Sequence, residues 1–342
     1  MRSALNNLAA NCKTANPGQV LTRLMGNNPN TEVNKQHLID NVIASAKATG
    51  WSGLPNSPTV YQRAYARWSH SVAPSADGMR LGDALELRGR LAVGMGIANP
   101  LEVGIHLHPV YGLPMIPGSA LKGVCAHHCH RVWGAKDPSF QKDADHHRWL
   151  FGTTEQAGVI TFLDAWWTPG INGPLVHEVI TPHHQKWQKE GKEPPTDFDS
   201  PIPVPFLAAS GKFLIALEYS GPKPADKAEA EQCSAWVKLA WTLLRETLTE
   251  SGVGGKTTSG FGIFAPPPPP VIPRRKLGTI VPRLTLVRQT NNVWFAQEPD
   301  GKEGRVQGNI RPDLRRVNCI ISAAIQDDNP DNRIYVQPAG PR

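Results

Sequence analysis

Five consecutive prolines, Pro266 to Pro270, constrain the fold of this chain more than any other feature. Proline has no backbone N–H and a fixed φ, so such a run cannot continue a helix or a central strand. It forms a stiff polyproline II spacer instead. We therefore predict four segments: a partly helical N-terminal extension (1–59), a main domain (60–265), a linker (266–270) and a basic, β-rich C-terminal domain (271–342).

The composition is that of a globular protein with a sizeable core. The chain has 342 residues, of which 40% are hydrophobic and 19% charged, and no apolar run approaches the ~20 residues of a membrane span. The first residues lack the apolar core of a signal peptide. Five scattered cysteines suit reduced thiols. We expect a cytoplasmic protein without membrane partners.

The C-terminal segment carries most of the net charge of +7. Residues 271–342 hold 12 Lys and Arg against 7 Asp and Glu, and ten of the twelve cations are arginine. Arginine binds phosphate in a fork and stacks on bases, so an anionic partner is indicated. A merely solvated tail is the alternative.

Hairpin signals divide the same segment. Short apolar runs are separated by Asn291-Asn292 and by Asp300-Gly301, residues typical of tight turns between strands. The segment is long enough for a small β-barrel or sandwich. An oligonucleotide-binding (OB-like) barrel is one interpretation.

The main domain alternates strand and helix patterns. We predict helices over 37–47 and 60–70, strands over 85–96 and 101–110, and a helix from 119 to about 133. A proline-rich surface excursion is expected over 168–205, between strands at 158–167 and 211–220; a helix over 225–252 follows. Strand, helix and strand thus occur twice, which predicts an α+β fold of two related units.

The segment Gly118-Ser119-Ala120-Leu121-Lys122-Gly123 is the first candidate binding site. Ser119 is a suitable N-cap for the predicted helix. Lys122 lies in the first turn, where a cation opposes the helix dipole unless an anion lies nearby. We predict that Gly118, Ser119 and Lys122 bind nucleic-acid phosphate. An ordinary exposed lysine is the alternative.

The glycine-rich loop GVGGKTTSGFG (252–262) is the second candidate. It is not an ATP site, because Glu250 occupies the position of the first glycine in the phosphate-binding motif. It is not an NAD site, because Thr257 replaces a required glycine. We predict no cofactor. A flexible loop with exposed N–H groups can still hold phosphate, through Gly252, Gly254, Gly255, Lys256, Thr257, Thr258, Ser259 and Gly260. The alternative is a plain helix-to-strand turn.

Several segments together resemble RAMP-superfamily proteins, in order and in rough spacing. Within that superfamily they are most similar to the sixth-subunit family of the Cmr complex, the type III-B CRISPR effector. The resemblance covers about residues 60–264. The segments are RLAVGMG, LEVGIHLHPVYGLPMIPGSALKGV, LFGTTEQAGVITFLDA, VITPHHQKWQKEGKEPPTDFDSPIPVPFL and GVGGKTTSGFGIF.

This resemblance implies two ferredoxin-like (RRM-like) units packed together, with the glycine-rich loop near the groove between them. It implies a subunit that caps the complex over the 3′ part of CRISPR RNA and contributes to recognition of target RNA. The implied neighbours are the repeated RAMP backbone subunit, the small helical subunit and another end-capping RAMP. The basic tail behind the prolines departs from the family pattern.

Two chemical alternatives remain. Some RAMP proteins cleave precursor CRISPR RNA without metal, and His106 and His108 share one face of a predicted strand. The segment CAHHCH (125–130) places Cys125 and Cys129 one helical turn apart, but a structural zinc site needs four ligands. We therefore predict a non-catalytic RNA-binding subunit without a metal.

Overall fold

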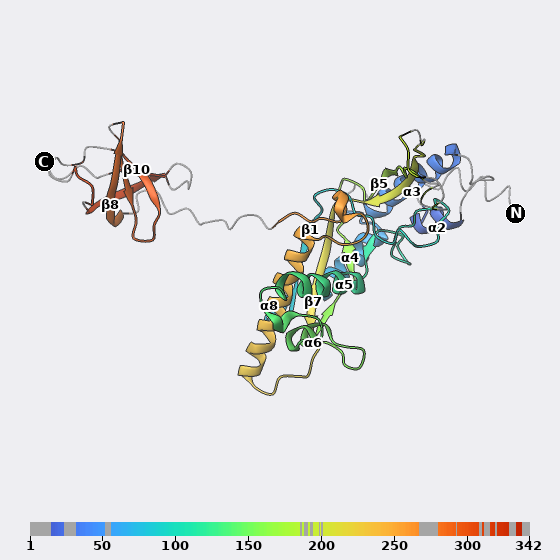
Figure 1. Cartoon of the computed structure of the whole chain (residues 1–342), viewed down its shortest axis with the longest axis horizontal. Coiled ribbons are helices and arrows are strands. Elements are labelled where there is room, and N and C mark those ends of the chain that lie inside the picture. Colours follow the sequence, from blue (N-terminus) through green and yellow to red (C-terminus); the bar gives the residue numbers. More distant parts are fainter. Residues whose placement is uncertain are drawn as a thin grey trace. The chain divides into compact units, whose positions relative to one another are not determined.

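The computed structural model describes residues 15–23, 32–51, 56–184, 187, 191, 194–197, 199, 201–266, 280–291, 293–307, 310, 315–318, 320–327 and 333–336. The chain divides into two compact units, residues 1–266 and 267–342 (Figure 1). Apart from Pro266, the predicted polyproline linker lies outside the described residues.

In the described residues, three helices precede the sheet of the larger unit: α2 (Pro17–Arg23), α3 (Glu32–Gly50) and α4 (Val60–Ser71). Helix α3 contains the predicted helix 37–47, and α4 matches the predicted helix 60–70. Apolar side chains of α2 and α3 belong to the main core, among them Val20, Leu21, Leu38, Ile39 and Val42. The described part of the predicted extension therefore folds onto the larger unit.

The aromatic stripe of α4 packs into this core. Tyr61 is 1% exposed, and its hydroxyl donates to the carbonyl of Trp167. Trp68 stacks on Trp166 with ring centroids 5.1 Å apart. The Tyr65 hydroxyl lies 3.0 Å from Thr168 Oγ1. The stripe fixes α4 to the sheet and is not a base-stacking platform.

One antiparallel sheet forms the centre of the larger unit. It contains β1 (Arg80–Glu86), β2 (Met115–Ile116), β3 (Ile160–Phe162), β4 (Ala165–Trp167) and β7 (Lys212–Tyr219). The order is β1-β7-β4-β2, and β3 also pairs with β7. A separate two-stranded sheet joins β5 (Leu175–Ile180), which lies within the predicted excursion 168–205, to β6 (Val204–Ala209), which begins at its end.

Two helices pack against each other and against the main sheet: α5 (Gly118–His128) and α8 (Lys227–Glu250). A π-helical turn, Cys129–Trp133, continues α5 to the predicted end of that helix. The short helix α6 (Asp145–Phe151) follows. Helix α8 ends as predicted, since Gly252 follows the C-cap residue Ser251 with φ +73°.

The predicted strand 85–96 is wrong in its bounds. The strand is β1, at 80–86, and beyond it Leu87, Leu91 and Ala92 make only isolated bridges, to Phe264, Ala209 and Gly255. The chain leaves the sheet here because 87–92 pairs with the segment that contains the glycine-rich loop.

The predicted strand 101–110 is not formed. Within it only Leu107 makes a bridge, to Pro114. Gly94 and Glu102 take left-handed conformations, with φ +78° and +70°, which a regular strand does not contain. His106 and Gly104 instead donate their N–H groups to the carbonyls of Val93 and Met95.

The larger unit is thus a mixed α/β fold built on antiparallel sheets, in agreement with the predicted α+β class. Its five-stranded sheet takes strands from both halves of the domain. The division into two ferredoxin-like units stays a prediction.

The smaller unit is a closed five-stranded barrel of order β10-β12-β11-β8-β9. Its strands are β8 (Ile280–Thr290), β9 (Val293–Gln297), β10 (Glu303–Gln307), β11 (Ile320–Asp327) and β12 (Ile334–Val336). Only β10 and β12 pair in parallel. Its core includes Leu284, Leu286, Ala296, Ile325 and Tyr335.

Candidate RNA-binding site

The start of α5 differs from the prediction. The N-cap is Pro117, not Ser119, and the exposed Ser119 makes no capping bond. The N–H of Gly118 donates to Asp164 Oδ1 at 2.7 Å, so a carboxylate of the chain itself occupies the helix N-terminus. That carboxylate places a negative charge at the helix N-terminus, next to Gly118.

Gly118 has a packing role. A Cβ there would lie 2.0 Å from the carbonyl oxygen of Phe162. The glycine lets α5 approach the turn between β3 and β4, where Asp164 interrupts the predicted strand 158–167. Phosphate binding is not needed to explain this residue.

Lys122 and Lys256 have free ammonium groups. Within the described residues neither makes a hydrogen bond or ion pair, and Lys256 is exposed. No such bond joins Lys122 to the glycine-rich loop either. A hydrogen bond between α5 and the end of α8 lies at the other end of α5, where His128 Nδ1 is 2.9 Å from Ser251 Oγ. The predicted groove between the two lysines therefore stays a prediction.

The glycine-rich loop, predicted to be flexible with several exposed N–H groups, is folded by a network of backbone hydrogen bonds. Gly252, Gly254, Gly260 and Gly262 all have φ between +69° and +89°. Most of the N–H groups in 252–262 donate to carbonyls. Four donate to nothing within the described residues, namely those of Gly254, Lys256, Thr257 and Thr258.

Lys256 is a turn residue as well as a cation. Its φ is +57°, left-handed, and it precedes the 3-10 turn Thr257–Ser259. The loop thus presents one cation, free N–H groups and the exposed hydroxyls of Thr258 and Ser259 together. This combination can hold a phosphate through backbone and side chain alike.

Arg88 and Arg90, which the sequence placed only in the predicted strand 85–96, are hydrogen-bonded to the end of this loop. The N–H of Arg88 donates to the Ile263 carbonyl at 2.9 Å, and Arg90 accepts from the Gly262 N–H at 2.7 Å. Both side chains are exposed. Arg90 pairs with Glu178 at 3.2 Å, whereas the Arg88 guanidinium has no hydrogen-bond or ion-pair partner among the described residues. The Arg-Gly-Arg sequence was the signal that could have revealed them.

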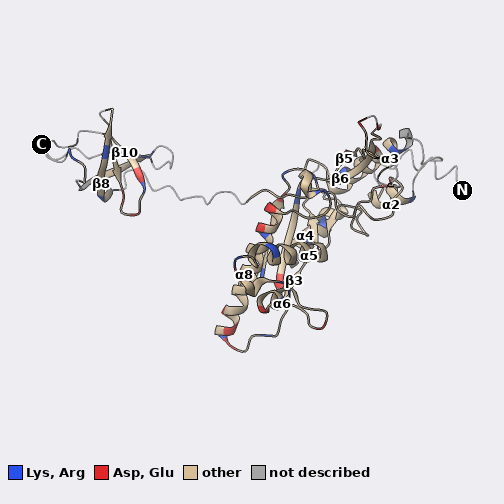
Figure 2. Ribbon diagram, viewed as in Figure 1, with Lys and Arg blue, Asp and Glu red and all other residues tan. Residues whose placement is uncertain are grey.

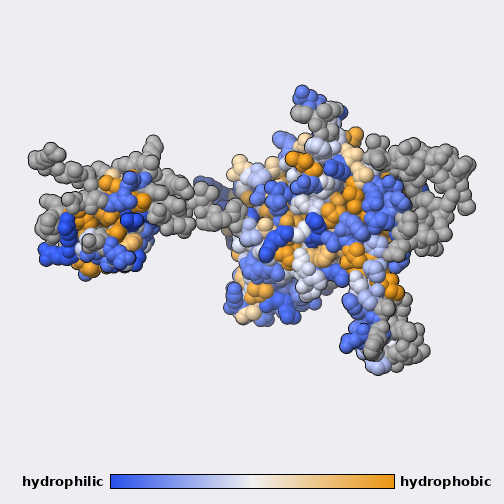
Figure 3. All heavy atoms as spheres, turned by 90° about the horizontal axis from the view of Figure 1, so that it is seen from above, coloured by the Kyte–Doolittle hydropathy of each residue, from blue (hydrophilic) through white to orange (hydrophobic). Residues whose placement is uncertain are grey.

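Charged, polar and hydrophobic residues are intermixed on the surface of the larger unit (Figure 2 and Figure 3). Lysines and arginines occur at separate places in both units (Figure 2). In the face that Figure 3 shows, hydrophobic residues of the larger unit are interspersed with hydrophilic ones. The candidate site is therefore defined by the loop geometry and by Arg88, Arg90 and Lys256, not by one large basic patch.

His106 and His108 have structural surroundings. His108 Nδ1 accepts the N–H of Val110 at 3.1 Å, and its ring packs on Tyr111 and Trp166 with centroids 4.7 and 4.6 Å away. Burial lowers the pKa of His108, which favours the neutral ring. Within the described residues no carboxylate is hydrogen-bonded to either histidine ring.

The CAHHCH segment does not assemble the cysteine site considered from sequence. Burial raises the pKa of the Cys125 thiol and raises that of Cys129 to about 12, which favours the neutral form of both thiols. Cys129 Sγ donates to the Phe140 carbonyl at 3.6 Å. Two further histidines have side-chain partners: His146 Nδ1 lies 2.8 Å from Ser139 Oγ, and His184 Nδ1 lies 2.8 Å from Asp199 Oδ2.

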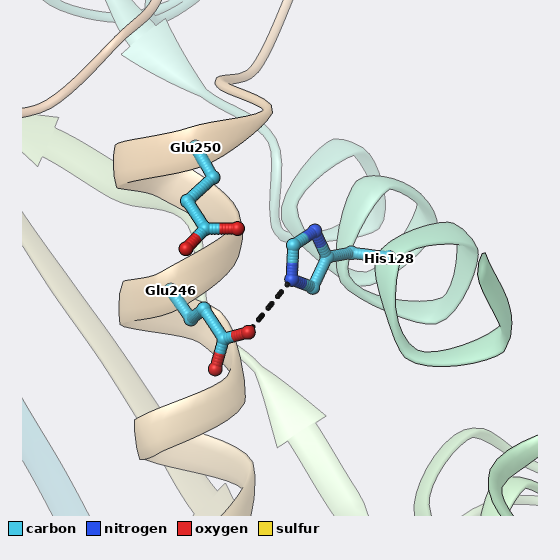
Figure 4. A group of neighbouring side chains, drawn as sticks. All are labelled: His128, Glu246 and Glu250. Atoms are coloured by element: carbon cyan, nitrogen blue, oxygen red, sulfur yellow. Dashed lines mark hydrogen bonds and ion pairs between the residues drawn. The ribbon is translucent and has the colours of Figure 1, made fainter. Parts of the chain in front are cut away.

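A different trio meets beside this segment. His128 of α5 faces Glu246 and Glu250 of α8 (Figure 4), and His128 Nε2 lies 3.3 Å from Glu246 Oε1. No sequence motif marks this group, because 118 positions separate His128 from Glu246.

Comparison with known proteins defines the family. The model of the RAMP superfamily matches residues 84–265, which is more than half of the chain. The protein therefore belongs to the RAMP superfamily, as the sequence segments indicated. No helix in the described residues is both long and apolar enough to cross a membrane.

Two curated relatives narrow the similarity. The chain is 26% identical to the CRISPR system Cmr subunit Cmr6 of Pyrococcus furiosus over 229 residues, 51% of this chain and 64% of the relative. It is 30% identical to the Cmr6 subunit of Saccharolobus solfataricus over 115 residues, 32% and 37% of the two chains. The matched region thus spans less than two thirds of either relative.

Two solved structures are also similar. A chain in the cryo-EM structure of type III-B Cmr-beta bound to cognate target RNA aligns with a TM-score of 0.47 and 17% identity, over 76% of this chain and 89% of the other. The crystal structure of Cmr6 from Pyrococcus furiosus aligns with a TM-score of 0.34 and 25% identity, over 55% and 97%.

Glycine substitutions test the loop geometry. A Cβ at Gly262 would lie 1.9 Å from the Val253 carbonyl oxygen, whereas one at Gly260 meets nothing within 4 Å. Both residues have positive φ. We expect Gly260→Ala to cost about 1–2 kcal/mol of unfolding free energy from strain alone, and Gly262→Ala on the order of 3–5 kcal/mol. Urea unfolding measures both, and equal losses would contradict the packing described.

Proposed function

We propose that this protein is a non-catalytic, RNA-binding structural subunit of a type III-B CRISPR effector complex in the cytoplasm. The observation that carries the proposal is the glycine-rich loop held against residues 86–92, which gathers Arg88, Lys256 and free backbone N–H groups. Both curated relatives are named Cmr subunits, and this supports the same assembly for this chain.

The finer role follows the family resemblance. We propose that the subunit caps the backbone over the 3′ part of CRISPR RNA and contributes to target-RNA recognition. Its neighbours would be the repeated RAMP backbone subunit, the small helical subunit and another end-capping RAMP.

The site supports binding without base reading. Lysine, arginine and backbone N–H groups bind phosphate oxygens, which fix the register of a strand and carry no sequence information. Lys122, Lys256 and Arg88 all lack ion-pair partners within the described residues, so binding phosphate would break no existing ion pair. The affinity should therefore depend strongly on salt.

Removing the two lysines tests the site. For Lys122→Ala combined with Lys256→Ala, we expect roughly 10-fold weaker binding of CRISPR RNA and a salt-dependence slope smaller by about 1.4, since each phosphate contact on a single strand contributes about 0.7. Filter binding over a salt series measures both values, and circular dichroism confirms the fold.

The matched control is Lys223→Ala with Lys227→Ala. It removes the same charge from exposed positions near the start of α8. If both double variants lose affinity equally, the effect is one of net charge, and the assignment of Lys122 and Lys256 is wrong.

Binding is favoured over cleavage by the surroundings of the histidines. His108 is engaged by the turn at Val110 and by two aromatic rings, and no carboxylate orients either histidine as a catalytic base among the described residues. We expect labelled repeat RNA to stay intact when it is incubated with purified protein in EDTA. Discrete products on a denaturing gel that disappear with His106→Ala would instead establish the alternative, a metal-independent endoribonuclease.

We propose that the C-terminal barrel contributes a second RNA contact. Its five strands close with the third and fifth in parallel, the arrangement of an oligonucleotide-binding barrel. On β9, Phe295 is half-buried, with the Arg288 guanidinium 4.3 Å from its ring centroid. The exposed Arg305 lies opposite Phe295 on β10. An aromatic ring beside arginines is a typical platform for an unpaired base.

The barrel contact predicts a loss on Phe295→Ala with Arg305→Ala. We expect roughly 10-fold weaker binding of single-stranded RNA by the full chain, because stacking contributes about 1–3 kcal/mol per base. The control, Arg283→Ala alone, removes one charge from an exposed position of β8 and leaves the Phe295 ring in place, so it should keep nearly full affinity. Unchanged affinity of the Arg305 variant would refute the contact.

A further inference from the structure

Three potential metal ligands converge between α5 and α8. His128 is the last residue of α5, while Glu246 and Glu250 lie one turn apart near the end of α8. One ligand atom from each lies within 4.8 Å of the other two (Figure 4). The two carboxylates come from one side of α8 and the imidazole from the facing helix, so a bound ion would bridge the helices.

The imidazole is held in the orientation that a ligand needs. Its side chain is 1% exposed. Nδ1 lies 2.9 Å from Ser251 Oγ, which leaves Nε2 directed toward the carboxylates. Metal-binding histidines are usually held through the second ring nitrogen in this way, because the outer bond fixes both tautomer and ring orientation.

Glu246 is oriented as well. Its Oε2 accepts the indole N–H of Trp133 at 3.0 Å, and Oε1 points to His128 Nε2 at 3.3 Å. Trp133 belongs to the π-helical turn that follows α5, so that turn supplies a second support to the site. One carboxylate oxygen remains available for an ion.

The carboxylates lack a compensating cation. In the described part of the chain, neither Glu246 nor Glu250 pairs with lysine or arginine, and the Glu250 side chain makes no hydrogen bond there. Like charges one helical turn apart repel. A divalent cation bound to all three side chains would offset this repulsion.

We propose that His128, Glu246 and Glu250 form a binding site for a divalent first-row transition ion such as Mn²⁺ or Zn²⁺. One imidazole nitrogen with two carboxylates suits these ions better than Mg²⁺ or Ca²⁺, which prefer oxygen alone. Glu250 is exposed, so water completes the coordination on that side. The role is structural: the ion fastens α5 to α8 immediately before Gly252, where the glycine-rich loop begins. This inference does not depend on RNA binding.

Metal titration of the full chain tests the site. After dialysis against EDTA and removal of the chelator, Mn²⁺ is added and the free ion is followed by electron paramagnetic resonance; Zn²⁺ is titrated by calorimetry. We expect one equivalent bound with micromolar affinity, and a higher melting temperature, because an ion bound only by the folded state stabilises it. Binding of less than a tenth of an equivalent of both ions would overturn the proposal.

Matched variants locate the ion. Glu250→Gln changes an exposed side chain without a hydrogen-bond partner among the described residues, so the apo protein should fold normally. We expect it to weaken Mn²⁺ and Zn²⁺ binding at least about 10-fold. Glu231→Gln, on the same helix and exposed, should leave binding unchanged. Equal affinity of the two variants would place the ion elsewhere and refute the site.

Discussion

The larger unit depends on a run of backbone hydrogen bonds between residues 86–92 and 255–265. Ala265 donates to the Glu86 carbonyl, Arg88 to Ile263, Gly262 to Arg90 and Gly255 to Ala92, all at 2.7–2.9 Å. Buried backbone groups need such partners, so this pairing explains why the chain leaves the sheet after β1. It also joins the beginning of the matched superfamily region to its end. The candidate RNA-binding site lies where these two segments, 86–92 and 255–265, pair.

Glycines in the glycine-rich loop allow residues 86–92 and 255–265 to pack closely against each other. Gly254 lies where a Cβ would be 2.5 Å from the Ala92 carbonyl oxygen. Most N–H groups of the loop donate to backbone carbonyls. Within the described residues, the N–H groups without an acceptor lie at and around Lys256. A rigid loop with a few available donors is better suited to bind phosphate than a flexible one, because less conformational entropy is lost on binding. At the α5 corner, by contrast, Asp164 already satisfies the helix N-terminus.

Much of the fold was predictable from local patterns, and the errors have physical causes. Helices α3, α4 and α8 follow apolar periodicity, and the turns around Asn291 and Gly301 join the strands of the barrel. The strand predicted at 101–110 is not formed, because alternation of residue types does not show that Glu102 adopts a left-handed conformation. Ser119 is not the N-cap because the helix begins at Gly118, with Pro117 as the N-cap residue. The N–H of Gly118 donates instead to the carboxylate of Asp164, 46 residues away.

The sequence by itself determined the family, the polyproline boundary and the main helices. It also placed Lys122 at the start of a helix and Lys256 in the glycine-rich loop. These depend on residue type and on short spacings, which a chain retains whether or not it is folded. Only the tertiary structure placed Arg88 and Arg90 beside the loop, and His128 beside Glu246 and Glu250. These residues meet because backbone pairing and helix packing join segments more than a hundred positions apart, and no local pattern encodes that distance.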